Sequence, residues 1–143
     1  MIQYREIMKV VGEQMDLDAK KIAVVGMGYV GFPLALLAAS KGYDVTALDV
    51  DADKVAAINN GASPLQDEAA GSKQTMARIT ATTDFSQVKG KSVIIVCVPT
   101  PVHENHQPDL GPLSGAIASV GAQLQPGQLV VSESTVNPGV SDD

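Results

Sequence analysis

The sequence is poor in cysteine and in aromatic residues, and both shortages limit the kind of protein it encodes. One cysteine in 143 residues cannot form an internal disulfide, which is typical of a reducing compartment, so a cytoplasmic protein is expected. Aromatic residues make up 3% and tryptophan is absent. The core is therefore expected to be aliphatic, as where helices pack on a sheet.

Basic residues and long apolar runs are also scarce. Ten Lys and Arg against 16 Asp and Glu give a net charge of −6, which leaves no basic surface for a phosphate backbone. No apolar run approaches the roughly 18 residues that span a membrane. Neither nucleic acid nor a membrane is expected as a partner.

The chain divides into two expected segments. Residues 1–20 carry apolar side chains at near-helical spacing with charges between them, which predicts an N-terminal helical extension. This helix would pack on the domain or on a second copy of the chain, so a homodimer is among the expected assemblies. Residues 21–143 are expected to form one domain, because 45% hydrophobic content suffices for a core at this length.

Apolar runs alternate with helical patterns along the second segment. Strands are predicted at 21–25, 44–48, 78–83, 92–98 and 129–132, and helices at 29–40, 51–60, 67–76 and 113–124. The first run, KIAVV, lacks polar alternation, as does a strand buried on both faces of a parallel sheet. This order predicts an α/β fold with a doubly wound, mostly parallel sheet and helices on both faces.

A glycine motif joins the first predicted strand to the first predicted helix. Gly26, Gly28 and Gly31 form G-x-G-x-x-G, whose glycines permit a tight turn, close approach of a pyrophosphate and close helix–strand packing, in that order. The N–H groups and dipole at the helix start would hold the phosphates. In this strand–helix context the motif predicts a Rossmann-type dinucleotide-binding domain.

Asp49 follows the second predicted strand and is the expected acidic partner of that motif. It lies 18 positions after Gly31, near the spacing of about 20 expected for the acid that binds the adenosine ribose. The alternative is a helix cap, for which Asp51 is better placed. A carboxylate at Asp49 repels a 2′-phosphate, so NAD is expected rather than NADP. Lys54 either approaches the adenosine end or is solvated.

Two later segments lie where strands end. In a doubly wound sheet, the loop after strand 92–98 and the segment 133–139 both lie at the carboxyl edge, beside the dinucleotide crevice. The Val98 backbone and the Thr100 hydroxyl are expected to face the cofactor, unless the loop is an ordinary turn. Hydroxyl and carboxylate groups of 133–139 are expected to reach the nicotinamide, its ribose or a catalytic water.

Three segments, in this order and spacing, resemble the UDP-glucose/GDP-mannose dehydrogenase family: KIAVVGMGYVGFPLALLAASKGYDVTALDVDADKV, VIIVCVPTP and VVSESTVNPG. The resemblance covers Lys21 to Gly139 and corresponds to that family's N-terminal NAD-binding domain. The V-P-T-P loop and Pro108-Asp109-Leu110 resemble the branch that acts on UDP-N-acetylhexosamines more than the UDP-glucose enzymes. The family oxidises the C6 alcohol of a nucleotide sugar to a carboxylate, using two NAD⁺ per sugar.

The resemblance implies a role for each matching residue. Those implied to hold the pyrophosphate are Gly26, Gly28, Tyr29, Val30 and Gly31; Asp49 and Lys54 would meet the adenosine ribose, and Val98, Pro99 and Thr100 would line the cleft. Ser134 and Thr135 resemble the pair beside the nicotinamide, where Thr135 would also position a water, the one catalytic role implied in this chain. The implied partner of the full-length enzyme is a UDP-sugar, and no metal is implied.

The family's nucleophilic cysteine lies downstream, in a Gly-Gly-x-Cys segment that this sequence does not contain. Cys97 lies in the most apolar predicted strand, where burial is expected to raise the pKa of its thiol and make it a core residue. His103 and His106 are interpreted as part of a solvated loop rather than a metal site. The chain alone is expected to bind NAD(H) without turning over a nucleotide sugar.

A second function remains open at this point. Stand-alone NAD(H)-sensing modules, like those attached to potassium transport systems, share a similar length, glycine loop and acidic residue. The V-P-T-P and E-S-T-V-N-P-G segments favour the dehydrogenase, because a sensor does not need them.

Overall fold

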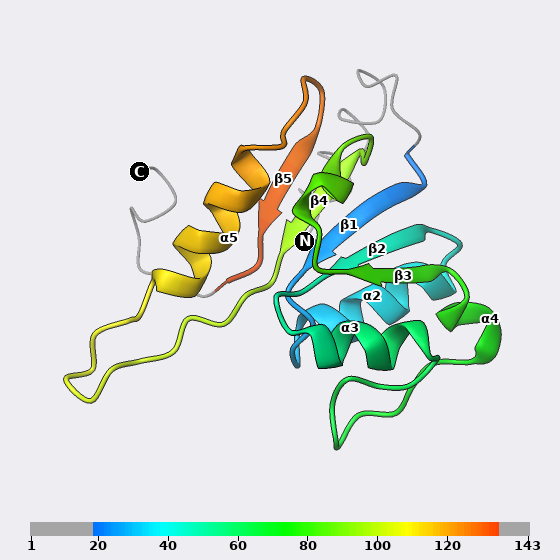
Figure 1. Ribbon diagram of the computed structural model, residues 1–143, viewed down its shortest axis with the longest axis horizontal. Helices are drawn as coiled ribbons and strands as arrows, with labels where there is room; N and C mark the ends of the chain where they lie inside the picture. The colour runs from blue at the N-terminus through cyan, green and yellow to red at the C-terminus, as the bar shows by residue number, and fades with distance from the viewer. Residues whose placement is uncertain (1–18, 135–143) are drawn as a thin grey trace, which may run out of the picture.

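A five-stranded parallel sheet forms the centre of the computed structural model, which describes residues 19–134 (Figure 1). The strands are β1 (Lys21–Val25), β2 (Asp44–Leu48), β3 (Ile79–Thr82), β4 (Val93–Val96) and β5 (Leu129–Ser132). Their order is β3-β2-β1-β4-β5, and every neighbouring pair is parallel. The order therefore reverses at β1, where the chain returns from β3 to pair β4 with the free side of β1. The extension predicted over 1–20 lies outside the described residues except for its last two positions.

Helices cover both faces of this sheet. They are α2 (Gly31–Ser40), α3 (Ala52–Asn59), α4 (Lys73–Met76) and α5 (Gly111–Gly121), together with the 3₁₀ helix η1 (Phe85–Val88). Buried residues of α2, α3 and α4 form one core cluster, and those of α5 and η1 form a second cluster on the opposite face (Figure 1). This arrangement confirms the predicted doubly wound α/β fold.

The β1 strand shows why its sequence lacks polar alternation. Ile22 and Val24 belong to the first core cluster, whereas Ala23 and Val25 belong to the second. All four residues are buried. Because successive side chains point to opposite faces, a strand covered on both faces has to be apolar at every position.

The predicted strands are all present, but one predicted helix is wrong over most of its length. Instead of 67–76, only Lys73–Met76 is helical, and the Ser72 side chain caps it by accepting the Thr75 amide. Gly71 lies directly before this cap, against α2: a Cβ there would come within 2.9 Å of Leu36. The η1 turn was not predicted, and no helix among the described residues is long and apolar enough to cross a bilayer.

A side chain covers part of the outer edge of β3. Asn59, the last residue of α3, donates from Nδ2 to the Ala81 carbonyl at 2.9 Å, and its Oδ1 accepts the Ala81 amide at 2.8 Å. Both backbone groups of Ala81 on this edge are therefore paired, which also makes them unavailable to another chain.

Replacing Asn59 by alanine should lower the free energy of unfolding by about 1–3 kcal/mol, because two backbone groups of Ala81 lose their partner. Urea denaturation followed by circular dichroism measures the change. Asn60→Ala is the matched control: no side-chain bond of Asn60 is present in the described structure, so a change below about 0.5 kcal/mol is expected. Equal effects of the two substitutions would contradict the role of Asn59 at this edge.

Candidate functional site

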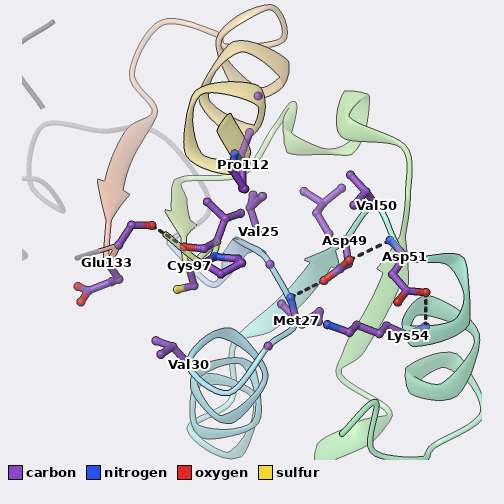
Figure 2. Close-up of a pocket in the computed structure, with 18 of the residues that line it drawn as sticks. Val25, Met27, Val30, Asp49, Val50, Asp51, Lys54, Cys97, Pro112 and Glu133 are labelled. Carbon is purple, nitrogen blue, oxygen red and sulfur yellow. Dashed lines mark hydrogen bonds between the residues drawn. The ribbon is translucent and has the colours of Figure 1, made fainter. Parts of the chain in front are cut away.

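A cleft of about 900 Å³ opens at the carboxyl ends of the strands, where the strand order reverses between β1 and β4 (Figure 2). Crevices at such switch points are where open α/β sheets bind ligands. The cleft brings together most of the residues predicted for the site: Gly26, Gly28, Tyr29, Val30, Asp49, Lys54, Val98, Pro99, Thr100 and Ser134. Gly31 packs beneath the glycine loop instead of lining the cleft, and Thr135 lies outside the described residues.

Three glycines of the loop meet three different surroundings. Gly26 has φ +95°, and a Cβ there would lie 2.8 Å from the Cys97 carbonyl oxygen. A Cβ on Gly31 would overlap the Gly26 carbonyl oxygen. By contrast, a Cβ on Gly28 would meet no atom within 4 Å. The first and third glycines are therefore required by backbone packing, as predicted, while the second faces open space.

The start of α2 presents unpaired hydrogen-bond donors to this open space. Within residues 19–134, no acceptor pairs with the backbone N–H groups of Gly28, Tyr29 or Val30. Val30, at the N-cap position, makes no side-chain cap bond, and the first turn of α2 contains no acidic residue. These N–H groups and the positive end of the helix dipole form a site suited to a phosphate group.

Asp49 links the glycine loop to the end of β2. Its half-buried carboxylate accepts the Met27 amide at Oδ2 (2.7 Å) and the Asp51 amide at Oδ1 (2.9 Å), as the dashed lines in Figure 2 show. Each carboxylate oxygen can accept a second hydrogen bond. Asp49 can therefore fix the loop and still bind hydroxyl groups that enter the cleft.

Asp51, and not Asp49, caps α3. The Asp51 side chain accepts the Asp53 amide at 2.9 Å and the Lys54 amide at 3.4 Å, which confirms it as the N-cap. Lys54 is half-buried, and in Figure 2 its side chain extends from α3 toward the loop at Met27. Its ammonium group thus lies on the β2 side of the cleft.

The opposite side of the cleft is built by the ends of β4 and β5. The Ser134 hydroxyl donates to the Val98 carbonyl at 2.9 Å, and the Glu133 amide donates to the Val96 carbonyl at 2.9 Å. These bonds hold the two strand ends together beyond their regular pairing. Glu133 and Ser134 therefore lie beside the end of β4 and the start of the V-P-T-P loop.

Cys97 directly follows β4 and is buried in the first core cluster. Burial, with a smaller effect of the nearby Glu133 carboxylate, raises the pKa of its thiol to about 11. A thiol with such a pKa is almost fully protonated at neutral pH and is a weak nucleophile. Cys97 is therefore a core residue, as predicted.

One wall of the cleft was not predicted. It consists of one face of α5, with Pro112, Gly115, Ala116 and Ser119, and of Phe85 from η1. The spacing of the α5 residues is that of one helix face, and three of them are small. Small residues at this spacing are the sequence signal that could have indicated a cleft wall. They are equally typical of helix–sheet packing, so the signal does not distinguish the two.

Two histidines that could have suggested a metal site lie outside the cleft. His103 and His106 are exposed in a hairpin whose ends are joined by the Val102–Pro108 bridge, which confirms the interpretation as a solvated loop. Among the residues that the structure describes, no group of three or more potential metal ligands occurs.

Comparison with known proteins gives a consistent result. The family model "UDP-glucose/GDP-mannose dehydrogenase family, NAD binding domain" matches residues 20–143. The chain is 40% identical over 124 residues to UDP-N-acetyl-D-glucosamine 6-dehydrogenase of Pseudomonas aeruginosa, and the alignment covers 86% of this chain and 29% of that protein. It is 36% identical over 126 residues to UDP-N-acetyl-D-mannosamine dehydrogenase of Pyrococcus horikoshii, and this alignment covers 85% of this chain and 30% of that protein.

Solved structures agree with these matches. The crystal structure of NDP-N-acetyl-D-galactosaminuronic acid dehydrogenase from Methanosarcina mazei Go1 superimposes with a TM-score of 0.79 at 32% identity, over 95% of this chain and 31% of that one. The chain spans about 30% of the length of the curated relatives it matches. These matches favour a dehydrogenase domain over the NAD(H)-sensing alternative.

Adding one methyl group should destabilise the domain at Gly31 but not at Gly28. Gly31→Ala should lower the free energy of unfolding by about 1–3 kcal/mol, despite the better helix propensity of alanine, because its Cβ overlaps the Gly26 carbonyl oxygen. Gly28→Ala should change it by less than about 0.5 kcal/mol, because its Cβ meets no atom. Thermal and urea unfolding measure both variants, and similar losses in the two would contradict this account of the loop.

The raised pKa of Cys97 predicts slow alkylation. Because its pKa is about 11 instead of the ordinary 9.0, its thiolate fraction at pH 8 is about 100-fold lower than that of a free cysteine. Iodoacetamide should label the native chain at least about 100-fold more slowly than the urea-unfolded chain. The native rate should rise with pH up to about 11. Cys97 is the only cysteine, so mass spectrometry reports this site alone, and equal native and unfolded rates would disprove the burial argument.

Proposed function

The chain belongs to the UDP-glucose/GDP-mannose dehydrogenase family as its NAD-binding domain, and from this premise we propose that it binds NAD for a nucleotide-sugar 6-dehydrogenase. The proposed substrate of the full-length enzyme is a UDP-N-acetylhexosamine, whose C6 alcohol is oxidised to a carboxylate. Bound NAD⁺ would supply the hydride acceptor for this reaction. The free cysteine thiol is consistent with a cytoplasmic location, which is part of the same proposal.

The observation that carries the proposal is that unpaired backbone amides and a carboxylate line the same cleft. The N–H groups of Gly28, Tyr29 and Val30 would hold the pyrophosphate, which approaches closely because Gly28 has no side chain. Asp49 would accept the ribose hydroxyls with the lone pairs that Met27 and Asp51 leave unused. Its negative charge would repel the 2′-phosphate of NADP.

The remaining site residues follow from the direction in which the dinucleotide would run. Asp49 and Lys54 lie on the β2 side of the loop, so the adenosine half would lie there. The nicotinamide half would then lie against the ends of β4 and β5, where Val98, Pro99 and Thr100 line the cleft. The Ser134 hydroxyl donates to Val98, so Ser134 would act by holding the two strand ends. We assign water positioning to Thr135, the next residue.

The choice of an N-acetylhexosamine rests on two supports. Both relatives compared by sequence above are named as dehydrogenases of UDP-N-acetylhexosamines. The V-P-T-P loop followed by Pro108-Asp109-Leu110 resembles the same branch. Because the chain spans about 30% of these relatives, cofactor binding is proposed for the chain itself, and sugar oxidation is proposed for a protein that also contains the rest of that length.

Calorimetric titration of the full chain with NAD⁺ tests the proposal. Asp49→Asn should weaken binding by about 1–3 kcal/mol, because a charged acceptor becomes a neutral one. The loss should be smaller for an NAD⁺ analogue that lacks the adenosine 2′-hydroxyl, since that contact is then already absent. Asp53→Asn, an exposed position on α3 outside the cleft, is the matched control and should leave the affinity unchanged. Unchanged affinity in Asp49→Asn would exclude Asp49 as the ribose ligand.

A further inference from the structure

The two sides of the cleft differ in charge. On the β2 side, the lining contains two carboxylates and one ammonium group, from Asp49, Asp51 and Lys54. On the β4–β5 side, Glu133 is the one ionised side chain among the described lining residues. No ion pair joins Glu133 to another residue of the described part of the chain. Among residues 19–134, its negative charge is therefore not neutralised by an ion-pair partner.

The backbone of Glu133 is held in place at the edge of the cleft. Its N–H donates to the Val96 carbonyl of β4, and the next residue, Ser134, donates its hydroxyl to Val98. Cys97, between these two acceptors, donates its own N–H to Val25 of β1 at 2.7 Å. The position from which the Glu133 side chain extends is thus fixed relative to both β1 and β4.

The charge of Glu133 acts on the interior of the site. Figure 2 shows the Glu133 and Cys97 side chains on the same side of the strand ends. The Glu133 carboxylate contributes to the raised pKa of the Cys97 thiol, which means that it disfavours a second negative charge there. By the same Coulomb interaction, it favours a positive charge in the part of the cleft that adjoins Cys97.

The proposed function supplies such a positive charge. This step rests on the cofactor direction given above, with the adenosine at Asp49 and the nicotinamide at the ends of β4 and β5. The nicotinamide ring carries one positive charge in NAD⁺ and none in NADH. The two forms of the cofactor otherwise present the same adenosine and pyrophosphate groups to the rest of the cleft.

We propose that Glu133 is a specificity-determining residue that shifts the cofactor preference of this domain toward NAD⁺ and away from NADH. The carboxylate stabilises the oxidised ring and loses that interaction when the ring becomes neutral. Reduction of the cofactor therefore removes this contribution to binding, which favours release of NADH and entry of fresh NAD⁺. A reaction that consumes two NAD⁺ for each sugar benefits from this exchange.

The test is the ratio of the dissociation constants for NADH and NAD⁺, measured by calorimetry on the full chain. For an exposed charge at the edge of the cleft, Glu133→Gln should lower this ratio by about threefold. Glu133→Lys should lower it further, because the sign of the charge is reversed. Glu104→Gln, in the exposed hairpin outside the cleft, is the matched control and should leave the ratio unchanged.

The possible outcomes separate this inference from the proposed function. If Glu133 had only a structural role, both substitutions would weaken NAD⁺ and NADH alike and leave the ratio within twofold of the wild type, which would overturn the inference alone. A wild-type chain that binds neither cofactor would overturn the proposed function and this inference together. A graded fall of the NADH/NAD⁺ ratio of dissociation constants, from the wild type to Glu133→Gln to Glu133→Lys, supports the inference.

Discussion

The close approach of α2 to the end of β1 is the constraint on which the site depends. Gly31 lies so near the Gly26 carbonyl that neither glycine can carry a side chain, and Gly26 adopts φ +95° to make the turn. This approach brings the first N–H groups of α2 to the carboxyl edge of the sheet, at the point where the strand order reverses. The same packing that stabilises the domain therefore creates its site for an anionic group.

The other parts of the cleft are tied to that turn by hydrogen bonds. Asp49 joins the end of β2 to the loop through the Met27 amide, and the Cys97 amide joins β4 to Val25 of β1. Ser134 extends the connection to β5. Four strand ends are thus fixed relative to one another. A single extended dinucleotide can therefore contact the amides at the start of α2, the Asp49 carboxylate and the part of the cleft near Glu133 at the same time.

Local signals in the sequence were sufficient for the fold and for much of the site. The apolar run of β1, the three glycines and the spacing to Asp49 each depend on residues close in the chain, and each was predicted. The bond from Met27 to Asp49 was not predictable, because a free backbone amide has no signature in the sequence. The wall formed by α5 and the isolation of Glu133 also depend on tertiary contacts, and the helix expected at 67–76 was shortened at Gly71.

The central claim is that the glycine loop, Asp49 and the ends of β4 and β5 form one NAD site. A crystal structure of the chain with NAD⁺ tests it most directly. The account predicts pyrophosphate oxygens within hydrogen-bond distance of the Gly28, Tyr29 and Val30 amides, with the adenosine ribose at Asp49 and the nicotinamide beside Glu133 and Ser134. A dinucleotide bound away from the start of α2, or bound there with its two halves exchanged, would contradict it.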